Sequence, residues 1–424
     1  MNGPAAGKLD VVIVGGGMIT HDQILPTIYH LKRLGRIGSI RICARHAARL
    51  KDLAASPMFA EGFPDASFEA FPSLDAPPHQ MHPELYKDVI GQLGPHNLVV
   101  VAVPDHLHDP VIREALSHDQ HVMAVKPLVP TYAEAVAIEN LARDRGLMVG
   151  VEYHKRFDRR VLEARRHYRK GRFGQFKCGE ARMIEAYYYR NSNFQNWFTK
   201  ENSDPFTYVG CHYVDQVYLI TGLRPVEVSV RGVEGAFPNG NIAYMWSAGM
   251  VVWENGAVLT LLDGLGYPDK AAGTNDQGLT MYCEGDNCGA ILKHNDQFRG
   301  ASHGFIDDDA GAHFRFVNPD YFRLVPWEGP GLKPVGYGYE SIEAIVAAAA
   351  RVNAAMDGVP SGDAALTARQ EVLHQIDEAG LVATPANSSI NELVTEAARL
   401  SIARSGQYAV IEYEPTPRVY LREG

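Results

Sequence analysis

The sequence lacks the marks of several protein classes. It contains no stretch approaching the roughly 20 consecutive apolar residues that a membrane-spanning helix needs, so we expect no membrane partner. Its 40 lysine and arginine residues are outnumbered by 50 aspartate and glutamate residues. The resulting net charge of −10 gives no reason to expect nucleic acid as a partner, because nucleic-acid-binding proteins usually carry basic patches. Residues 1–8 lack the apolar core of a signal peptide, so we expect a cytoplasmic location.

Cysteine is also scarce. An odd number of scattered cysteines does not fit a disulfide framework. Cys283 and Cys288 flank a short acidic turn, but no second cysteine pair accompanies them, so we expect no metal site. The five cysteines are Cys43, Cys178, Cys211, Cys283 and Cys288.

Length and patterning predict two domains, because 424 residues exceed one ordinary core. In residues 1–150, short apolar runs alternate with helical segments, which predicts an α/β domain with a doubly wound parallel sheet. In residues 151–424, strand-like segments follow one another, which predicts an α+β domain with a large, mainly antiparallel open sheet. The expected strands are 9–14, 39–44, 97–103, 120–125, 147–151, 226–233, 243–253 and 257–262. The expected helices are 22–34, 83–93 (within an insertion at 57–95), 111–117, 133–145, 341–356 and 391–405.

The first expected strand runs directly into a glycine-rich turn. Gly15 permits a tight turn, and Gly17 lets the backbone approach a pyrophosphate at the start of the next helix, where Met18 and Ile19 stand. Strand, glycine turn and helix in this order are typical of a Rossmann dinucleotide-binding domain. Thr20 takes the place of the third glycine, so the motif alone also fits a turn without a ligand.

The end of the second expected strand bears on which dinucleotide is bound. NAD enzymes usually place a carboxylate there to hold the ribose 2′-OH, whereas this strand ends in Ala44 and Arg45. Guanidinium pairs well with phosphate, so this pair suits the 2′-phosphate of NADP. We expect NADP slightly in preference to NAD. The alternative is that Arg45 is a solvated residue at a helix start.

Two further turns follow neighbouring parallel strands. Pro104, Asp105 and His108 come after the strand at 97–103, and Lys126 comes after the strand at 120–125. Ligands of open α/β sheets bind at this carboxyl edge, so we expect all four residues to contact the cofactor. A lysine at this edge also favours a reacting hydroxyl in its deprotonated form or polarises a carbonyl. The alternative for Lys126 is an ordinary surface lysine.

The second domain contributes a tyrosine and a histidine at helical spacing. Tyr208 and His212 lie four residues apart, so on a helix they share a face and point into one cleft. Asp215 either orients His212 or caps the helix. His212 taken alone also fits a buried core histidine. Trp197, which follows an aromatic run at 187–189, either lines a pocket for a sugar ring or fills a core.

Taken in order, these pieces resemble the glucose–fructose oxidoreductase / inositol dehydrogenase (Gfo/Idh/MocA) family, and the resemblance runs to about residue 225. The matching segments are the glycine turn at 15–20, the Ala-x-Pro-x-x-x-His turn at 102–108, Lys126 with Pro127, an aromatic-and-arginine segment at 153–157 that contains Tyr153 and Arg156, and Gly-x-His-x-x-Asp at 210–215. Two positions depart from the family pattern: Val125 replaces the usual glutamate and Tyr208 the frequent aspartate.

The resemblance implies hydride transfer between a nicotinamide and a hydroxyl or carbonyl carbon of a sugar, glycoside or cyclitol. It implies that Lys126 is the catalytic lysine and His212 the general acid/base, and we expect Tyr208 and Asp215 to be catalytic as well. The residues expected to bind the substrate are Lys126, Tyr153, Arg156, Trp197, Tyr208 and His212. Family members commonly associate through the large sheet, so a homodimer or homotetramer is expected. Two alternatives stay open: an NAD(P)-dependent glycosidase or lyase that oxidises a sugar transiently, and a non-enzymatic dinucleotide-binding sensor.

Overall fold

The computed structural model describes residues 7–271, 275–285, 289–295, 302–307, 311–316 and 320–423. The chain forms two compact units. The first unit comprises Met1–Val129, Ala133–Phe157 and Tyr321–Asn387. The second unit comprises Pro130–Tyr132, Asp158–Asp320 and Ser388–Gly424. A single boundary at residue 150 does not reproduce this division, because a late segment of the chain packs with the N-terminal unit.

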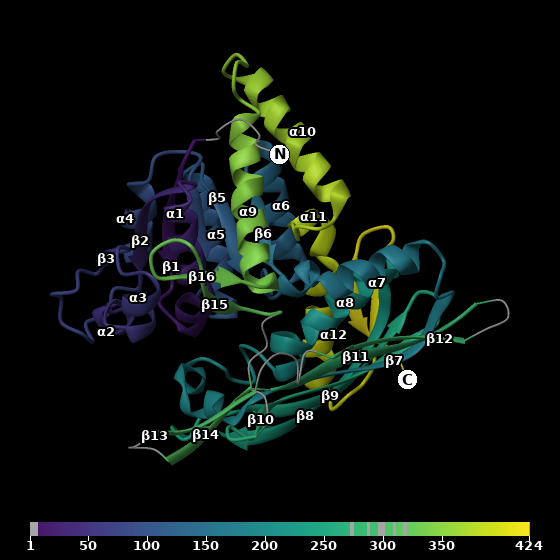
Figure 1. Ribbon diagram of the computed structural model, residues 1–424. Helices are drawn as coiled ribbons and strands as arrows, with labels where there is room; N and C mark the ends of the chain where they lie inside the picture. The colour runs from purple at the N-terminus through teal and green to yellow at the C-terminus, as the bar shows by residue number, and fades with distance from the viewer. Residues whose placement is uncertain are drawn as a thin grey trace. The chain divides into compact units, whose positions relative to one another are not determined.

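The first unit is built on a six-stranded sheet with the order β3-β2-β1-β4-β5-β6, in which all neighbours are parallel (Figure 1). This confirms the doubly wound α/β prediction. The strand β3 has no counterpart among the expected elements and lies inside the segment that was expected to be an insertion. The strands are β1 (Leu9–Val14), β2 (Ile37–Cys43), β3 (Glu69–Phe71), β4 (Leu98–Val101), β5 (His121–Val125) and β6 (Val149–Glu152).

Helices from both ends of the chain pack on this sheet (Figure 1). Ile345 of α9 approaches β6 so closely that a Cβ on Gly150 would lie 2.7 Å from its side chain. The late segment thereby becomes part of the N-terminal core. The helices of the first unit are α1 (Leu25–Arg33), α2 (Ala47–Ala54), α3 (Pro57–Gly62), α4 (Leu85–Gly91), α5 (His108–Ser117), α6 (Tyr132–Arg145), α9 (Tyr337–Ala354) and α10 (Asp363–Ala379), with the short hairpin β15 (Arg323–Pro326) and β16 (Leu332–Val335).

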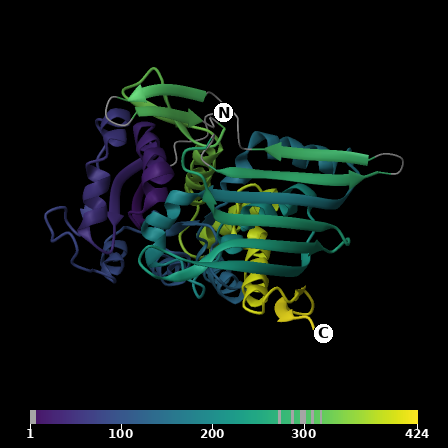
Figure 2. The same cartoon turned by 90° about the horizontal axis from the view of Figure 1, so that it is seen from below.

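The second unit is built on an eight-stranded sheet with the order β12-β11-β7-β10-β9-β8-β17-β18 (Figure 2). Only β10 and β7 run parallel, so the sheet is mainly antiparallel as predicted. The strands are β7 (Gln175–Ala186), β8 (Pro225–Ala236), β9 (Ile242–Trp253), β10 (Val258–Tyr267), β11 (Asp276–Glu284), β12 (Gly289–Asn295), β17 (Ala409–Glu412) and β18 (Arg418–Leu421). A separate hairpin pairs β13 (Ser302–Asp307) with β14 (Gly311–Phe316).

The two faces of the large sheet differ in what covers them. One face shares a hydrophobic core with α7 (Arg159–Arg169), α8 (Cys211–Thr221) and α12 (Ile390–Ile402), while α11 (Pro385–Ser388) joins the two units along the chain. On the other face, Leu262, Tyr282 and Ile291 are 47–53% exposed. In the part of the chain that the structure describes, no helix is long and apolar enough to cross a membrane.

Candidate functional site

The glycine turn after β1 packs tightly against the end of β4. Gly15 has a φ of +117°, and a Cβ there would lie 2.1 Å from the carbonyl oxygen of Ala102. The Gly15 N–H donates to the Cys43 carbonyl oxygen over 2.8 Å. The Thr20 hydroxyl donates to the Gly15 carbonyl oxygen over 2.8 Å. The protein's own packing therefore requires glycine at 15, and Thr20 supports the turn where the usual motif has a third glycine.

Gly17 differs from Gly15 because none of the described residues requires glycine there. A Cβ at Gly17 would meet no atom of these residues within 4 Å, and its φ is outside the left-handed range. Helical structure begins immediately afterwards at Met18 and Ile19. An open space over a helix N-terminus fits a dinucleotide pyrophosphate, which needs close backbone approach and N–H donors.

The segment after β2 is basic. Ala44 is partly buried and Arg45 is exposed, and neither neighbour of this pair is a carboxylate. The His82 N–H donates to the Arg45 carbonyl over 2.7 Å, and the rings of His46 and His79 lie 6.2 Å apart. Burial, followed by nearby arginine charge, lowers the pKa of His46. The loop at 72–84 therefore adds imidazoles to the predicted arginine.

The turns after β4 and β5 are joined by His108. Its side chain is fully buried, with Nδ1 2.9 Å from the Pro127 carbonyl oxygen and 3.0 Å from that of Leu128. Its Nε2 lies 2.9 Å from the carbonyl oxygen of Val103. These contacts use both ring nitrogens, so the imidazole is occupied by backbone, and contact between His108 and the cofactor stays a prediction. His108 holds the backbone beside Lys126.

The other predicted residues at the carboxyl edge of the sheet differ in how deeply their side chains are buried. Pro104 and Lys126 are partly buried at the ends of their strands, while Asp105 is 4% exposed in the short 3-10 turn η2 (Asp105–Leu107). Lys126 follows β5 directly and precedes a cis-proline. The position of Lys126 at the carboxyl edge matches the prediction.

Tyr153 and Arg156 are buried and contact other side chains of the protein. Both are 1% exposed, and Arg156 donates to the Asn387 side-chain oxygen over 2.9 Å. The Arg156 guanidinium also lies 5.9 Å from the centre of the Tyr153 ring. The arginine ties the segment after β6 to α11, and its contact with substrate stays a prediction.

A buried polar network at the end of β6 has no counterpart among the predicted site residues. Gln23 donates to Glu152 over 2.9 Å, and the Tyr321 hydroxyl donates to Gln23 over 2.6 Å. His154 Nδ1 lies 3.0 Å from the second Glu152 oxygen, and its ring stacks on Tyr337 at 5.6 Å. The only local signal for this network is a carboxylate at the end of an apolar strand.

In the second unit, Tyr208 and Trp197 lie in one aromatic cluster. The Tyr208 ring lies 5.9 Å from Trp197, 5.1 Å from Phe194 and 5.8 Å from Phe198. Tyr208 is in a π-helical turn, η6 (Phe206–Gly210), while His212 is in α8, so the expected continuous helix changes its winding between them. The structure thus places Tyr208 beside Trp197, as expected if both contact one substrate ring.

His212 and Asp215 are both 2% exposed on α8. The Asn391 amide donates to Asp215 over 2.9 Å. Asp215 is the fifth residue of α8, so the expectation that it caps the helix is wrong. Gly210 is needed beside His212 because a Cβ there would lie 2.7 Å from the carboxylate of Asp263.

Among the described residues, no group of three or more histidine, cysteine, aspartate or glutamate side chains is placed to hold a metal ion. Cys283 is buried, and burial raises the pKa of its thiol to about 11. Cys288, the other half of the pair considered from the sequence, lies outside the described residues.

The N-terminal third of the chain is similar in sequence to known proteins. Residues 9–153 match the Gfo/Idh/MocA family, described as an oxidoreductase family with an NAD-binding Rossmann fold. An uncharacterised oxidoreductase of Schizosaccharomyces pombe is 32% identical over 30% of this chain and 34% of its own length. Inositol 2-dehydrogenase 1 of Saccharopolyspora erythraea is 30% identical over 34% of this chain and 40% of its own length. The chain thus aligns with little more than a third of either relative.

Solved structures resemble nearly the whole chain. Scyllo-inositol dehydrogenase from Lactobacillus casei, with bound NAD(H) and scyllo-inositol, has a TM-score of 0.60 at 13% identity and covers 95% of this chain and 99% of its own. GenD2 from gentamicin A biosynthesis, in complex with NAD, has a TM-score of 0.63 at 16% identity and covers 97% of this chain and 99% of its own. These likenesses confirm the predicted fold. Residues 9–153 thus match the Gfo/Idh/MocA family of oxidoreductases with an NAD-binding Rossmann fold, the family that the sequence motifs resemble.

Proposed function

We propose that this protein is an NAD(P)-dependent dehydrogenase or reductase that acts on a hydroxyl or carbonyl carbon of a sugar, glycoside or cyclitol. The observation that carries the proposal is the open glycine turn at Gly17 over a helix N-terminus, in a domain that matches an NAD-binding oxidoreductase family. Support for the substrate class comes from two proteins of the same fold that were solved with an inositol bound, a scyllo-inositol dehydrogenase and an inositol dehydrogenase homolog.

Lys126 and His212 are the proposed catalytic residues. A bound nicotinamide would supply or accept the hydride. His212 would take the proton of the reacting hydroxyl, because imidazole is the side chain that exchanges protons near neutral pH. The Lys126 ammonium would stabilise negative charge that develops on the same oxygen. In the reductive direction His212 would return the proton to the oxygen of the carbonyl.

Tyr208 and Trp197 are proposed to hold the substrate ring. Their rings form one aromatic cluster, and the flat faces of sugar and cyclitol rings pack well on aromatic side chains. Asp215 and its partner Asn391 are proposed to fix α8, and with it His212. Neither of these two residues needs to touch the substrate for this role.

The basic segment after β2 supports a preference for NADP. Arg45 and Arg49 are exposed, and the imidazoles of His46, His79 and His82 belong to the same segment or to the loop packed on it. Arg49 is partly compensated by Asp52 at 3.7 Å, whereas the structure shows no ion pair of this kind for Arg45 among the described residues. A 2′-phosphate is therefore expected to pair with Arg45.

Two measurements test the activity. Absorbance of the reduced nicotinamide is followed while sugars, glycosides and cyclitols are screened with each cofactor, and the proposal expects substrate-dependent change. Glycoside cleavage with no net nicotinamide change would instead indicate the transient-oxidation alternative. Calorimetry with Arg45→Ala is expected to weaken NADP binding about ten-fold or more and to leave NAD binding unchanged. Arg166→Ala, on α7 of the second unit, serves as the matched arginine control.

The open face of the large sheet is proposed to bind a second copy of the chain. Leu262, Tyr282 and Ile291 leave apolar area exposed on that face, which is typical of an interaction surface. Leu262→Glu is expected to lower the mass measured by light scattering from that of an oligomer to that of a monomer. Leu34→Glu, at an equally exposed leucine of the first unit, should not change the mass. A wild-type monomer at micromolar concentration would contradict the proposal.

A further inference from the structure

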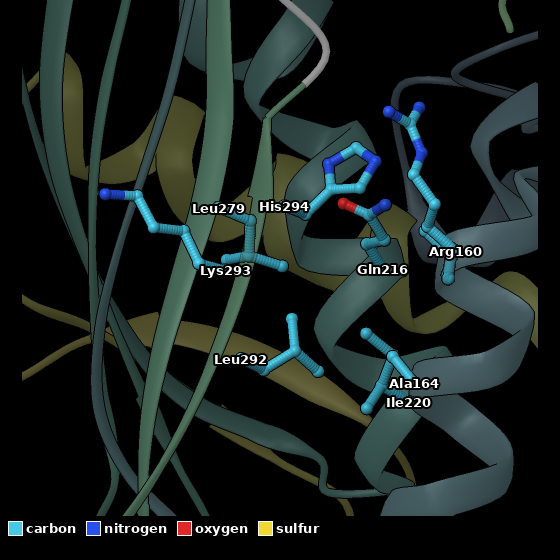
Figure 3. Close-up of a pocket in the computed structure, with 9 residues that line it drawn as sticks. Arg160, Ala164, Gln216, Ile220, Leu279, Leu292, Lys293 and His294 are labelled. Atoms are coloured by element: carbon cyan, nitrogen blue, oxygen red, sulfur yellow. The ribbon is translucent and has the colours of Figure 1, made fainter.

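A cavity of about 160 Å³ lies within the second unit, between the helices α7 and α8 and the strands β11 and β12 (Figure 3). Figure 3 shows the Gln216 amide and the His294 ring at one end of the cavity and Leu292, Ile220 and Ala164 further along it. Lys293 belongs to the opposite face of the sheet, and its side chain points away. The cavity is thus polar at one end and aliphatic along its length.

The Gln216 side chain is the reason to regard the cavity as a binding site. It is 1% exposed, and among the described residues neither its amide oxygen nor its amide nitrogen has a hydrogen-bond partner. A buried amide without partners costs stability, so such groups are rare unless a water or a ligand satisfies them. The Gln216 amide offers N–H donors on its nitrogen and an acceptor on its oxygen, which matches a hydroxyl or an amide.

The charges around Gln216 are already compensated. Asp158 receives hydrogen bonds from His294 over 2.8 Å and from Arg160 over 2.8 Å. Burial by itself would raise the pKa of Asp158, but the bonds from His294 and Arg160 outweigh it and lower the pKa to about 2. Asp158 therefore stays ionised and neutralises the guanidinium. A ligand beside this cluster gains little from carrying a charge of its own.

The rest of the cavity wall selects for an apolar group of limited size. An engineered protein cavity of about 150 Å³ lined by aliphatic side chains is large enough for benzene, so the present cavity admits one six-membered ring. The aliphatic wall residues are Val161, Ala164, Ile220, Leu279 and Leu292.

The cavity also has a defined relation to His212. Gln216 and His212 lie four residues apart on α8, so they occupy the same face about 6 Å apart along the axis. We propose that this cavity binds an uncharged, mainly apolar ring of the substrate that carries one hydroxyl or amide group. The substrate is then a glycoside or a ring-substituted sugar rather than a free sugar or cyclitol. This inference rests on the proposed function for the identity of the substrate but not for the existence of the site.

The first test measures binding without catalysis. Benzamide, which combines a six-membered ring with one amide, is titrated into the cofactor-free protein and followed by saturation-transfer NMR. We expect saturable binding with a Kd of about 1 mM and at least ten-fold weaker binding of benzoate. Gln216→Leu and Ala164→Leu should each weaken benzamide binding at least ten-fold. Lys293→Ala, whose side chain points away, should leave it unchanged.

The second test measures turnover. Phenyl glycosides are compared with the corresponding free sugars, and Ala164→Leu is expected to lower kcat/KM at least ten-fold for the glycoside only. Benzamide that fails to bind, or binds all variants equally, overturns the site. If Ala164→Leu lowers kcat/KM equally for the glycoside and the free sugar, the proposed substrate class is refuted. Benzamide binding without any nicotinamide turnover would uphold the site while refuting the proposed function.

Discussion

Replacing Gly17 by alanine adds a methyl group to the glycine turn where the protein itself leaves room for one. The added Cβ meets no atom of the described residues within 4 Å, and the backbone needs no left-handed φ there. Alanine also has fewer unfolded conformations to lose, so the free energy of unfolding should stay equal or rise by about 0.4–1 kcal/mol. The same methyl group would occupy the space through which a pyrophosphate approaches the helix start. We therefore expect NADH and NADPH to bind at least ten-fold more weakly, about 1.4 kcal/mol.

Gly15→Ala provides the contrast because the protein's own packing forbids a side chain there. Its Cβ would lie 2.1 Å from the Ala102 carbonyl oxygen at a φ of +117°. Strain and overpacking together should cost at least about 3 kcal/mol. Gly16→Ala is the matched control, since its Cβ would meet neighbours at 3.5–3.6 Å, which is ordinary contact. Cofactor affinity is measured by fluorescence titration of NADH, and stability by urea unfolding.

The reasoning fails if Gly17→Ala binds NADH as tightly as the wild type, because the pyrophosphate would then not lie over this turn. It fails equally if Gly17→Ala unfolds as easily as Gly15→Ala. In that case, the loss of binding would reflect lost structure rather than a blocked site.

Lys126→Ala and His212→Ala should each lower turnover by about 10²–10⁴-fold while NADH titration shows retained binding, since removal of a positioned acid or base has effects of this size. His108→Leu should lower kcat at least ten-fold with a smaller change in the KM for cofactor, because the turn beside Lys126 loses its backbone bonds. Burial lowers the pKa of His121 from 6.5 to about 4. Because the pKa of His121 is lower in the folded state than in the unfolded state, its contribution to the free energy of unfolding is fully present above pH 6.5. That contribution is lost as the pH falls towards 4, which lowers the free energy of unfolding by about 3 kcal/mol. Urea unfolding of His121→Gln should lose that part of the pH dependence, whereas His374→Gln, at an exposed helix position, should keep it; equal curves for the two variants would contradict the assignment.

Local pattern was sufficient for the parts of the fold that are made by neighbouring residues. β4 and the part of β1 from Val11 to Val14 are continuous apolar runs because both of their faces are buried, and the sequence shows these runs directly. The glycine turn was identifiable because Gly15 and Gly17 stand at fixed offsets from the end of β1. The family resemblance rests on the same kind of local signal, and the match over residues 9–153 confirms it.

Tertiary structure alone decided features that depend on distant contacts. β3 has three residues and no fully buried side chain, so it depends on pairing with β2 and on the packing of Ala70 against the core of the first unit. The helices α9 and α10 belong to the first unit because α9 packs on Gly150, which no local pattern reveals. The same limit applies to single residues. The sequence predicts that His108 contacts the cofactor, whereas in the structure its ring nitrogens contact backbone carbonyls up to 20 residues away. Gln216 carries no motif, and it became a candidate only because folding buried its amide without a partner among the described residues.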